Sequence, residues 1–366
     1  MHVHQKSDHA DPRRVISMQR IVETPDFSSA LKEEVAAYNN ALFVHSPSFI
    51  KRDAFGKISS IPHETFSDFE PNPDYESIVE GAEVFRAKNC DCLVSIGGGS
   101  SIDVAKGIKH ILKNRDIVHI AIPTTSGTGC ESTQFAVVYK EGVKQSLDSE
   151  ELLPNVAILD GSLVLSVPDF QKRCTSLDAM CQCIESHWSM NSTEESREYS
   201  MAGLKMIISN HKSYLANDPD AGRNMMCGAN LSGRAINITR TTAPHALSYA
   251  ITKEYGIPHG CAVALTVIQF WDLLLSNLDE TTHPAGKKFM EERLNELSCA
   301  FGGKGLSDGL NMADNVIAEL FPSMNAHAGD AQMILSEINT DRLKNYPLNL
   351  KSKELERIVS QVIIQS

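Results

Sequence analysis

Four polar residues in the C-terminal half of the sequence have side chains that suit a metal site. Asp178 and Gln182 are four residues apart in a helical pattern and therefore share one helix face. His245 and His259 follow, the second within Pro258-His259-Gly260. A carboxylate and two imidazoles that leave coordination positions open suit a divalent ion acting as a Lewis acid. Each residue alone also has an ordinary interpretation, since Asp178 could cap a helix and either histidine could be a hydrogen-bonded core residue.

A glycine-rich turn in the N-terminal half suits a bound pyrophosphate. It follows the apolar run 92–96, which predicts a short buried strand, and it precedes a helical pattern. Glycines let the backbone approach a ligand closely, and a helix N-terminus offers free N–H groups to an anion. A tight turn with no ligand is the alternative. The residues expected to contact a nucleotide here are Gly97, Gly98, Gly99, Ser100 and Asp103.

A second polar loop, residues 123–132, follows the predicted strand 118–122 and contains several hydroxyl groups. Open α/β sheets bind ligands at the carboxyl ends of their strands. Two such loops after neighbouring strands favour a nucleotide cleft over a Ser/Thr-rich surface loop. The further contacts expected for a nucleotide are Thr124, Thr125, Thr128 and, in the hairpin that follows, Lys144.

The elements that must position these groups change character near Pro168. Upstream, strands alternate with helices, which indicates βαβ units and a parallel sheet. The expected strands are 41–44, 92–96, 118–122 and 156–160, with helices near 28–38, 74–88 and 102–113 and a hairpin made by 133–138 and 144–146. Downstream, long helical periodicities are broken at 217–219, 302–303 and 345–347. We therefore predict a loose polar arm (1–14), a dinucleotide-binding α/β domain (15–168) and a helical metal- and substrate-binding domain (169–366).

Composition limits the classes of partner. The chain of 366 residues has a formal net charge of −12, which disfavours nucleic acid or an anionic membrane as a partner. Its apolar fraction of 42% is typical of a globular protein, and no stretch approaches the roughly 20 apolar residues of a membrane span. Nine scattered cysteines are interpreted as reduced thiols, so we expect a cytoplasmic protein.

Taken together, segments 97–106, 123–131, 153–160 and 258–260 resemble the iron-containing (group III) alcohol dehydrogenases, and the resemblance runs from about Arg20 to the C-terminus. It implies an N-terminal Rossmann-like domain and an all-α C-terminal domain, a fold shared with dehydroquinate synthase. It also implies NADH or NADPH in the cleft between them, and a homodimer or larger homo-oligomer. One divalent ion is implied, with Fe²⁺ expected and Zn²⁺ possible, held by an aspartate and three histidines. Asp178, His245 and His259 match three of these four ligands.

The sequence departs from the family pattern at three positions. Gln182 replaces the second histidine ligand, so the amide oxygen either binds the ion more weakly or leaves three protein ligands. Tyr249 replaces a further histidine, and its phenol could donate a proton or bind cofactor or substrate; with His245 and His259 it completes the predicted catalytic set. Ser46 stands where many NAD-preferring members have an aspartate, which makes NADPH acceptable.

The segment before His245 points to the substrate. Arg240 and Thr241 could form a pocket for a compact anion, because arginine donates fork-like hydrogen bonds to phosphate-type groups. The alternative is a surface arginine paired with an acid. The pattern resembles the phosphonoacetaldehyde reductase branch, which implies reduction of phosphonoacetaldehyde to 2-hydroxyethylphosphonate. The rival functions are a general short-chain alcohol dehydrogenase, a dehydroquinate synthase-like lyase, and a binding protein with a decayed site.

Overall fold

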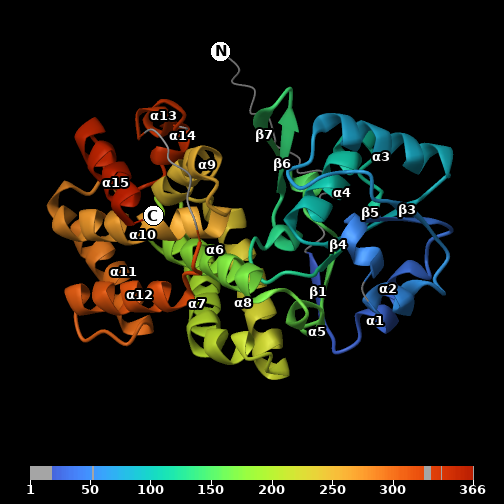
Figure 1. The fold of residues 1–366 in the computed structure, drawn as a ribbon, viewed down its shortest axis with the longest axis horizontal. Coiled ribbons are helices and arrows are strands. Elements are labelled where there is room, and N and C mark those ends of the chain that lie inside the picture. The colour runs from blue at the N-terminus through green and yellow to red at the C-terminus, as the bar shows by residue number, and fades with distance from the viewer. Residues whose placement is uncertain (1–18, 52, 325–330, 339, 366) are drawn as a thin grey trace, which may run out of the picture.

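The chain folds into an α/β half followed by a helical half, which confirms the predicted fold class (Figure 1). The computed structural model describes residues 19–365 except 52, 325–330 and 339, so the arm predicted over 1–14 lies outside the described residues. Strands end at Leu159, and the first long helix of the second half begins at Asp169.

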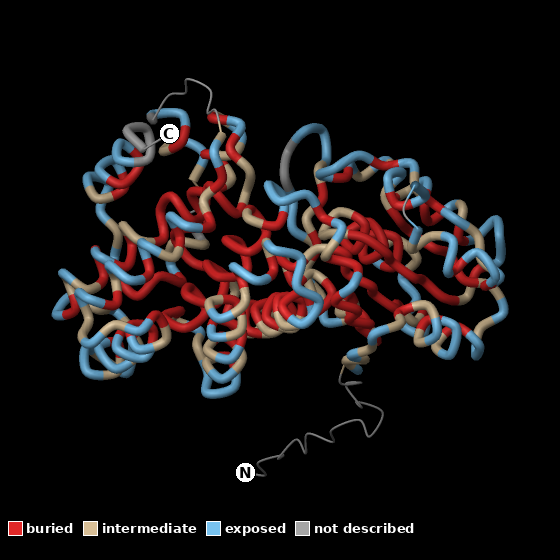
Figure 2. Tube along the Cα trace, turned by 60° about the horizontal axis from the view of Figure 1, so that its bottom comes forward, coloured by how far each residue is buried: buried red, intermediate tan, exposed pale blue. Residues whose placement is uncertain are grey.

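Six parallel strands form the sheet of the α/β half in the order β1-β8-β5-β4-β2-β3. Their bounds are Arg20–Glu23 (β1), Ala41–His45 (β2), His63–Phe66 (β3), Cys92–Gly97 (β4), Val118–Pro123 (β5) and Val156–Leu159 (β8). β2 and β4 are buried along their whole length. Buried residues fill the interior of both halves (Figure 2). Side chains of β2 and β4 enter two separate apolar clusters, one containing Phe43 and Val94 and the other Leu42 and Leu93. This burial on both faces is the reason that the strands have continuous apolar sequences.

The predicted helices of this half correspond to α1 (Phe27–Val35), α3 (Tyr75–Ala87) and α4 (Gly99–Leu112). The last begins three residues earlier than predicted, because the glycine turn leads directly into the helix. The short elements β1, β3, α2 (Asp53–Ile58) and α5 (Ser162–Leu165) were not singled out by periodicity, since four to six residues carry too little of it. The predicted hairpin is present as β6 (Phe135–Lys140) and β7 (Val143–Asp148).

The helical half consists mainly of long helices, and the three predicted breaks fall between them. The longer helices are α6 (Asp169–Trp188), α7 (Glu194–Leu215), α8 (Pro219–Thr239), α9 (Ala243–Tyr255), α10 (His259–Ser276), α11 (Gly286–Ala300), α12 (Leu306–Leu320) and α15 (Ser352–Gln365). Two short helices, α13 (Ala331–Ser336) and α14 (Thr340–Leu343), precede α15. Within the described residues, α10 alone is long and apolar enough to cross a bilayer, but 67% of it is buried among other elements of the fold, as in a core helix.

The two halves meet where two glycines pack against each other. Gly129 follows β5 and adopts a left-handed backbone with φ +60°, and Gly233 lies inside α8. A Cβ atom added at Gly233 would lie 2.8 Å from the Cα atom of Gly129, closer than real Cβ atoms approach. The absence of side chains therefore lets the 123–132 loop rest directly on α8.

Replacing Gly233 with Val should force this contact apart. Overpacking costs about 1–3 kcal/mol, so we expect the unfolding midpoint to fall by roughly 1–4 °C in calorimetry. Gly56→Ala is the matched control, because no heavy atom lies within 4 Å of a Cβ at Gly56. That variant should unfold within about 1 °C of the parent. Equal midpoints for both variants would show that the close approach of the glycines is not required.

Candidate metal and nucleotide site

The predicted metal ligands Asp178, His245 and His259 come together in the structure. One ligand atom from each lies within 4.8 Å of the other two. The Asp178 Oδ1 atom is 3.3 Å from His245 Nε2 and 3.7 Å from His259 Nε2. Ligands about 2.1 Å from a shared ion lie roughly 3.0–3.4 Å apart, so a small movement would allow all three to bind one divalent ion. The donor set of one carboxylate and two imidazoles fits Fe²⁺ or Zn²⁺.

Three helices bring these ligands together. Asp178 lies in the middle of α6, His245 in the first turn of α9, and His259 is the first residue of α10. α10 approaches α6 closely at Gly260, where an added Cβ would clash with the Cys174 carbonyl oxygen and would lie 3.0 Å from Asp178 Cβ. Gly260 is therefore the residue that allows the His259 end of α10 to reach Asp178.

The outward-facing nitrogen of each histidine is held by a neighbouring side chain. His245 Nδ1 makes a short hydrogen bond to Glu185 Oε1, and His259 Nδ1 lies 3.3 Å from Ser248 Oγ. A carboxylate behind a histidine fixes the tautomer that leaves Nε2 free to bind a metal. Glu185 was not among the predicted site residues, although it lies seven positions, or about two turns, after Asp178 on the same helix.

Glu185 is fully buried and has a partner for both oxygens. Its Oε2 atom accepts hydrogen bonds from the backbone N–H of Thr242 at 2.5 Å and from the Thr242 hydroxyl at 2.8 Å. Thr242 also accepts a hydrogen bond from Trp188 Nε1. Since Thr242 is the N-cap of α9, the carboxylate also lies at the positive end of that helix.

The cluster is electrostatically suited to a cation. Burial alone would lower the pKa of His245, but the carboxylates of Glu185 and Asp178 raise it to about 10. Burial alone would raise the pKa of Asp178, but hydrogen bonding to His245 and the charges of both histidines lower it. Two buried carboxylates need compensating positive charge, which either a protonated histidine or a divalent ion provides.

Gln182 lies beside the cluster but its amide is already engaged. Its Oε1 atom accepts a 2.8 Å hydrogen bond from Ser232, and its Nε2 atom donates to the Thr128 carbonyl at 3.4 Å. These contacts suit a residue that links α6 to α8 and to the 123–132 loop. Its predicted role as a metal ligand stays a prediction.

Tyr249 stacks on His259, one of the predicted metal ligands. Its ring lies 5.2 Å from the His259 ring at an interplanar angle of 14°, and its hydroxyl accepts a hydrogen bond from Arg342 of α14. Burial raises the pKa of Tyr139 in β6, and the Tyr249 phenol adds to this shift. Tyr249 therefore lies between the metal cluster, α14 and the hairpin of the α/β half.

The glycine turn and the 123–132 loop meet at the carboxyl edge of the sheet. Gly97 pairs with Pro123 in register, and the Thr124 N–H donates to the Gly97 carbonyl at 2.9 Å. Gly97 has φ +157°, and a Cβ there would collide with Ser101. Cβ atoms added at Gly98 and Gly99 would each lie 3.3 Å from a threonine hydroxyl, those of Thr125 and Thr128.

No side chain caps the first turn of α4 at Gly98, so its N–H groups, including that of Ser100, are available to a phosphate. The same loop continues toward the metal ligands, because Gln182 binds the Thr128 carbonyl. The predicted phosphate cradle and the predicted metal cluster are thus joined by a single loop. Their arrangement fits a dinucleotide whose pyrophosphate lies at α4.

Three other residues that were expected to contact the nucleotide lie away from the glycine turn or make other contacts. The buried Asp103 carboxylate accepts a hydrogen bond from the Val137 N–H, which attaches β6 to α4. Ser46 is near the end of β2, where its hydroxyl lies 3.0 Å from that of Ser48. The backbone of Lys144 pairs with Tyr139, and its side chain lies outside the described residues.

Arg240 is paired with an acid, which was the alternative interpretation of this residue. Its Nη2 atom binds both oxygens of Asp148 at 2.9 and 2.7 Å, and Nη1 donates to the Asn237 carbonyl at 2.7 Å. Its guanidinium also lies 4.9 Å from the centre of the Phe135 ring. Thr241 is buried, and its carbonyl accepts from Asn345. The guanidinium that was expected to bind a substrate anion instead attaches the β6–β7 hairpin to the end of α8.

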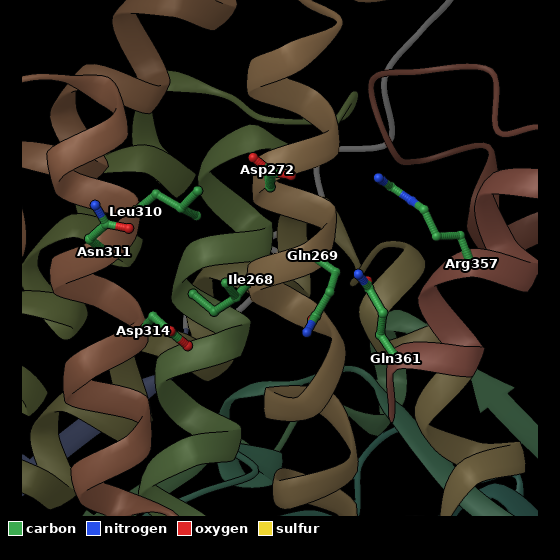
Figure 3. Close-up of a pocket in the computed structure, with 8 residues that line it drawn as sticks. All are labelled: Ile268, Gln269, Asp272, Leu310, Asn311, Asp314, Arg357 and Gln361. Atoms are coloured by element: carbon green, nitrogen blue, oxygen red, sulfur yellow. The ribbon is translucent and has the colours of Figure 1, made fainter. Parts of the chain in front are cut away.

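A separate hollow of about 190 Å³ lies between α10, α12 and α15 (Figure 3). Polar side chains such as Asp272, Asp314 and Arg357 line it. Its residues on α10 begin nine positions after His259, or roughly 14 Å along the helix at 1.5 Å per residue. It is therefore distinct from the metal cluster.

Comparison with known proteins identifies the family. Residues 19–161 match the model of the iron-containing alcohol dehydrogenases, and residues 173–344 match that of the C-terminal region of the same family. These two matches cover most of the sequence. The chain belongs to the iron-containing alcohol dehydrogenase family.

Curated relatives share about a quarter to a third of the aligned residues. Alcohol dehydrogenase 4 of Schizosaccharomyces pombe is 27% identical over 66% of this chain and 64% of its own length. The NAD-dependent methanol dehydrogenase of Bacillus methanolicus is 31% identical over 53% of this chain and 56% of its own. The matched regions thus span less than two thirds of either relative.

Solved structures share the fold across nearly the whole chain. A sulfoacetaldehyde reductase from Bifidobacterium kashiwanohense, solved in complex with NAD⁺, superposes with a TM-score of 0.82 at 22% identity and covers 99% of this chain and 100% of that one. A 1,3-propanediol oxidoreductase gives 0.79 at 24% identity, covering 94% of this chain and 97% of the other.

His259→Ala should remove one ligand and abolish stoichiometric binding of metal, while the helical content in circular dichroism stays the same. Elemental analysis after dialysis against a weak chelator measures this. A variant that retains one equivalent of metal would exclude His259 as a ligand.

Glu185→Gln should weaken metal binding roughly 10–100-fold, because the amide no longer holds His245 in the tautomer that binds through Nε2. Competition with a fluorescent chelator gives the dissociation constants. Gln182→Glu is the comparison variant within the same helix, and it should not weaken binding. Unchanged affinity in Glu185→Gln would assign Glu185 a purely structural role.

Proposed function

We propose that this chain is an NAD(P)-dependent, metal-dependent alcohol dehydrogenase that acts as a reductase of small aldehydes. The observation that carries the proposal is the Asp178, His245 and His259 cluster, linked through Gln182 and Thr128 to the uncapped glycine turn of α4. Family membership supports a bound metal ion, and the NAD- and NADPH-dependent relatives support a bound nicotinamide cofactor.

When bound, a divalent ion polarises the carbonyl oxygen and the reduced nicotinamide supplies the hydride. Asp178, His245 and His259 hold the ion, and Glu185 and Ser248 orient the two imidazoles. The first turn of α4 and the hydroxyls of Thr125 and Thr128 hold the cofactor phosphates. Tyr249 stacks on His259 and presents a phenol that can supply a proton to the product oxygen.

For the substrate we propose a compact aldehyde that carries an anion, with phosphonoacetaldehyde as the leading candidate and 2-hydroxyethylphosphonate as its product. The shared fold of the sulfoacetaldehyde reductase supports an anionic aldehyde. The second candidate is an uncharged short-chain alcohol, which the methanol and butanol dehydrogenases among the relatives favour. We also propose a cytoplasmic homodimer or larger homo-oligomer.

The loss of absorbance at 340 nm tests the reaction class, using protein loaded with Fe²⁺ or Zn²⁺, either reduced cofactor, and charged and uncharged aldehydes. Consumption of the cofactor with any aldehyde supports the reductase. Turnover of a sugar phosphate with no net change at 340 nm would instead indicate the lyase. No reaction under any condition would indicate a decayed site.

Gly98→Val should raise the dissociation constant of the cofactor at least tenfold, because a branched side chain would fill the space beside Thr125, where a Cβ alone is already 3.3 Å from Oγ1. Quenching of nicotinamide fluorescence measures the constant. If Gly98→Val binds the cofactor as tightly as the parent, the role of the glycine turn is purely structural.

Ser46→Asp should shift preference toward NADH, because a carboxylate repels a 2′-phosphate and accepts from the ribose hydroxyl. The ratio of kcat/KM for NADPH to that for NADH should fall about tenfold or more. Ser48→Asp is the neighbouring control. Identical ratios in Ser46→Asp and the parent would exclude Ser46 as the selector.

A further inference from the structure

An anionic substrate needs a positive charge in the site, and the metal cluster itself does not supply that charge. A divalent ion carries two positive charges, and the Asp178 and Glu185 carboxylates beside it carry two negative ones. The bound ion can therefore polarise a carbonyl oxygen but offers no net attraction to a distant phosphonate or sulfonate. The whole chain, at −12, repels such an anion further. Since Arg240 is neutralised by Asp148, another cation has to bind the anion.

Arg342 has the position that this role requires. It lies in α14, which packs against α9 at the top of the helical half in Figure 1. Its Nη1 atom donates to the Tyr249 hydroxyl, and its guanidinium lies 4.9 Å from the centre of the Tyr249 ring. Tyr249 in turn stacks at 5.2 Å on His259. The guanidinium and the His259 ring are thus separated by no more than the sum of these two distances.

This upper limit leaves room for a short substrate. A two-carbon aldehyde spans roughly 5 Å from its carbonyl oxygen to the oxygens of a terminal phosphonate or sulfonate. A metal–oxygen bond of about 2 Å and a hydrogen bond of about 2.9 Å complete the distance from ion to guanidinium. An uncharged aldehyde would make no use of Arg342.

The charge of Arg342 is less compensated than that of Arg240. Among the carboxylates of the described residues, none forms an ion pair with Arg342, whose guanidinium interacts with Tyr249. Arg342, Tyr249 and His259 are each half-buried, so none of the three is sealed in the core. A guanidinium that keeps free N–H groups beside an aromatic ring is suited to a tetrahedral oxyanion.

We propose that Arg342, positioned by Tyr249, binds the phosphonate or sulfonate group of the substrate while its carbonyl oxygen lies at the Asp178–His245–His259 cluster. This inference rests on the proposed reductase function and specifies its substrate. Attachment at both ends fixes the carbonyl carbon against the nicotinamide, so that binding energy at Arg342 orients the reacting group.

The test compares Arg342→Ala with the parent on phosphonoacetaldehyde, sulfoacetaldehyde and uncharged butanal. We expect kcat/KM for both anions to fall roughly tenfold to more than a hundredfold, the range for a lost hydrogen bond to a charged group, and that for butanal to fall less than threefold. Arg342→Lys should keep part of the selectivity. Arg240→Ala is the matched control and should change all three aldehydes equally.

A binding measurement gives a readout apart from turnover. Ethylphosphonate should bind the metal-loaded parent in titration calorimetry and bind Arg342→Ala at least tenfold more weakly. The metal content and the dissociation constant for NADH should be the same in both. Equal losses on charged and uncharged aldehydes would contradict the proposal, as would a selective loss in Arg240→Ala or weakened NADH binding in Arg342→Ala.

The same data separate the two proposals. A parent that reduces none of the aldehydes contradicts the reductase function, and ethylphosphonate binding still decides the role of Arg342. A parent that reduces butanal and both anions, with unchanged ratios in Arg342→Ala, contradicts the Arg342 inference alone.

Discussion

The buried carboxylate of Glu185 is the interaction on which the site depends. It binds the Nδ1 atom of His245 through one oxygen and the N-cap residue of α9, Thr242, through the other. A single side chain of α6 thus sets both the start of α9 and the orientation of an imidazole. Removing it would leave the buried Nδ1 atom of His245 and the backbone N–H of Thr242 without this acceptor, each costing about 1–3 kcal/mol. The orientation of His245 and the packing of α6 against α9 therefore depend on the same side chain.

The close contact between the two halves also depends on a few residues. Gly129 and Gly233 allow the loop after β5 to lie on α8, and Gln182 binds that loop from α6 through the Thr128 carbonyl. The hydroxyl of Thr128 is meanwhile packed beside Gly99 at the start of α4. A nucleotide held at α4 and an ion held at α6 would consequently have a fixed separation. Such pre-set spacing is what hydride transfer between cofactor and substrate requires.

Much of this arrangement could be predicted from the sequence. Continuous apolar runs such as 92–96 indicated strands covered on both faces, and the glycine turn after them indicated a phosphate site. Asp178, His245 and His259 were identified by residue type and family resemblance, although 67 and 81 positions separate the histidines from the aspartate. Glu185 was missed because a glutamate two turns along a helix from a ligand has no distinctive pattern. The pairing of Arg240 with Asp148 had no sequence signal, because the two residues are 92 positions apart and only the tertiary fold shows that they meet. Arg342 had no sequence signal for the same reason.

Anomalous diffraction from crystals of the protein grown with Fe²⁺ and NAD⁺ shows whether Asp178, His245 and His259 hold one ion. Data collected on both sides of the iron absorption edge locate the ion without reference to activity. We expect one strong peak about 2.0–2.3 Å from Asp178 Oδ1, His245 Nε2 and His259 Nε2. The Glu185 carboxylate should still bind His245 Nδ1, and the cofactor pyrophosphate should lie at the first turn of α4. A peak away from these three atoms, or an ordered cofactor with no metal between Asp178 and the histidines, would contradict this expectation.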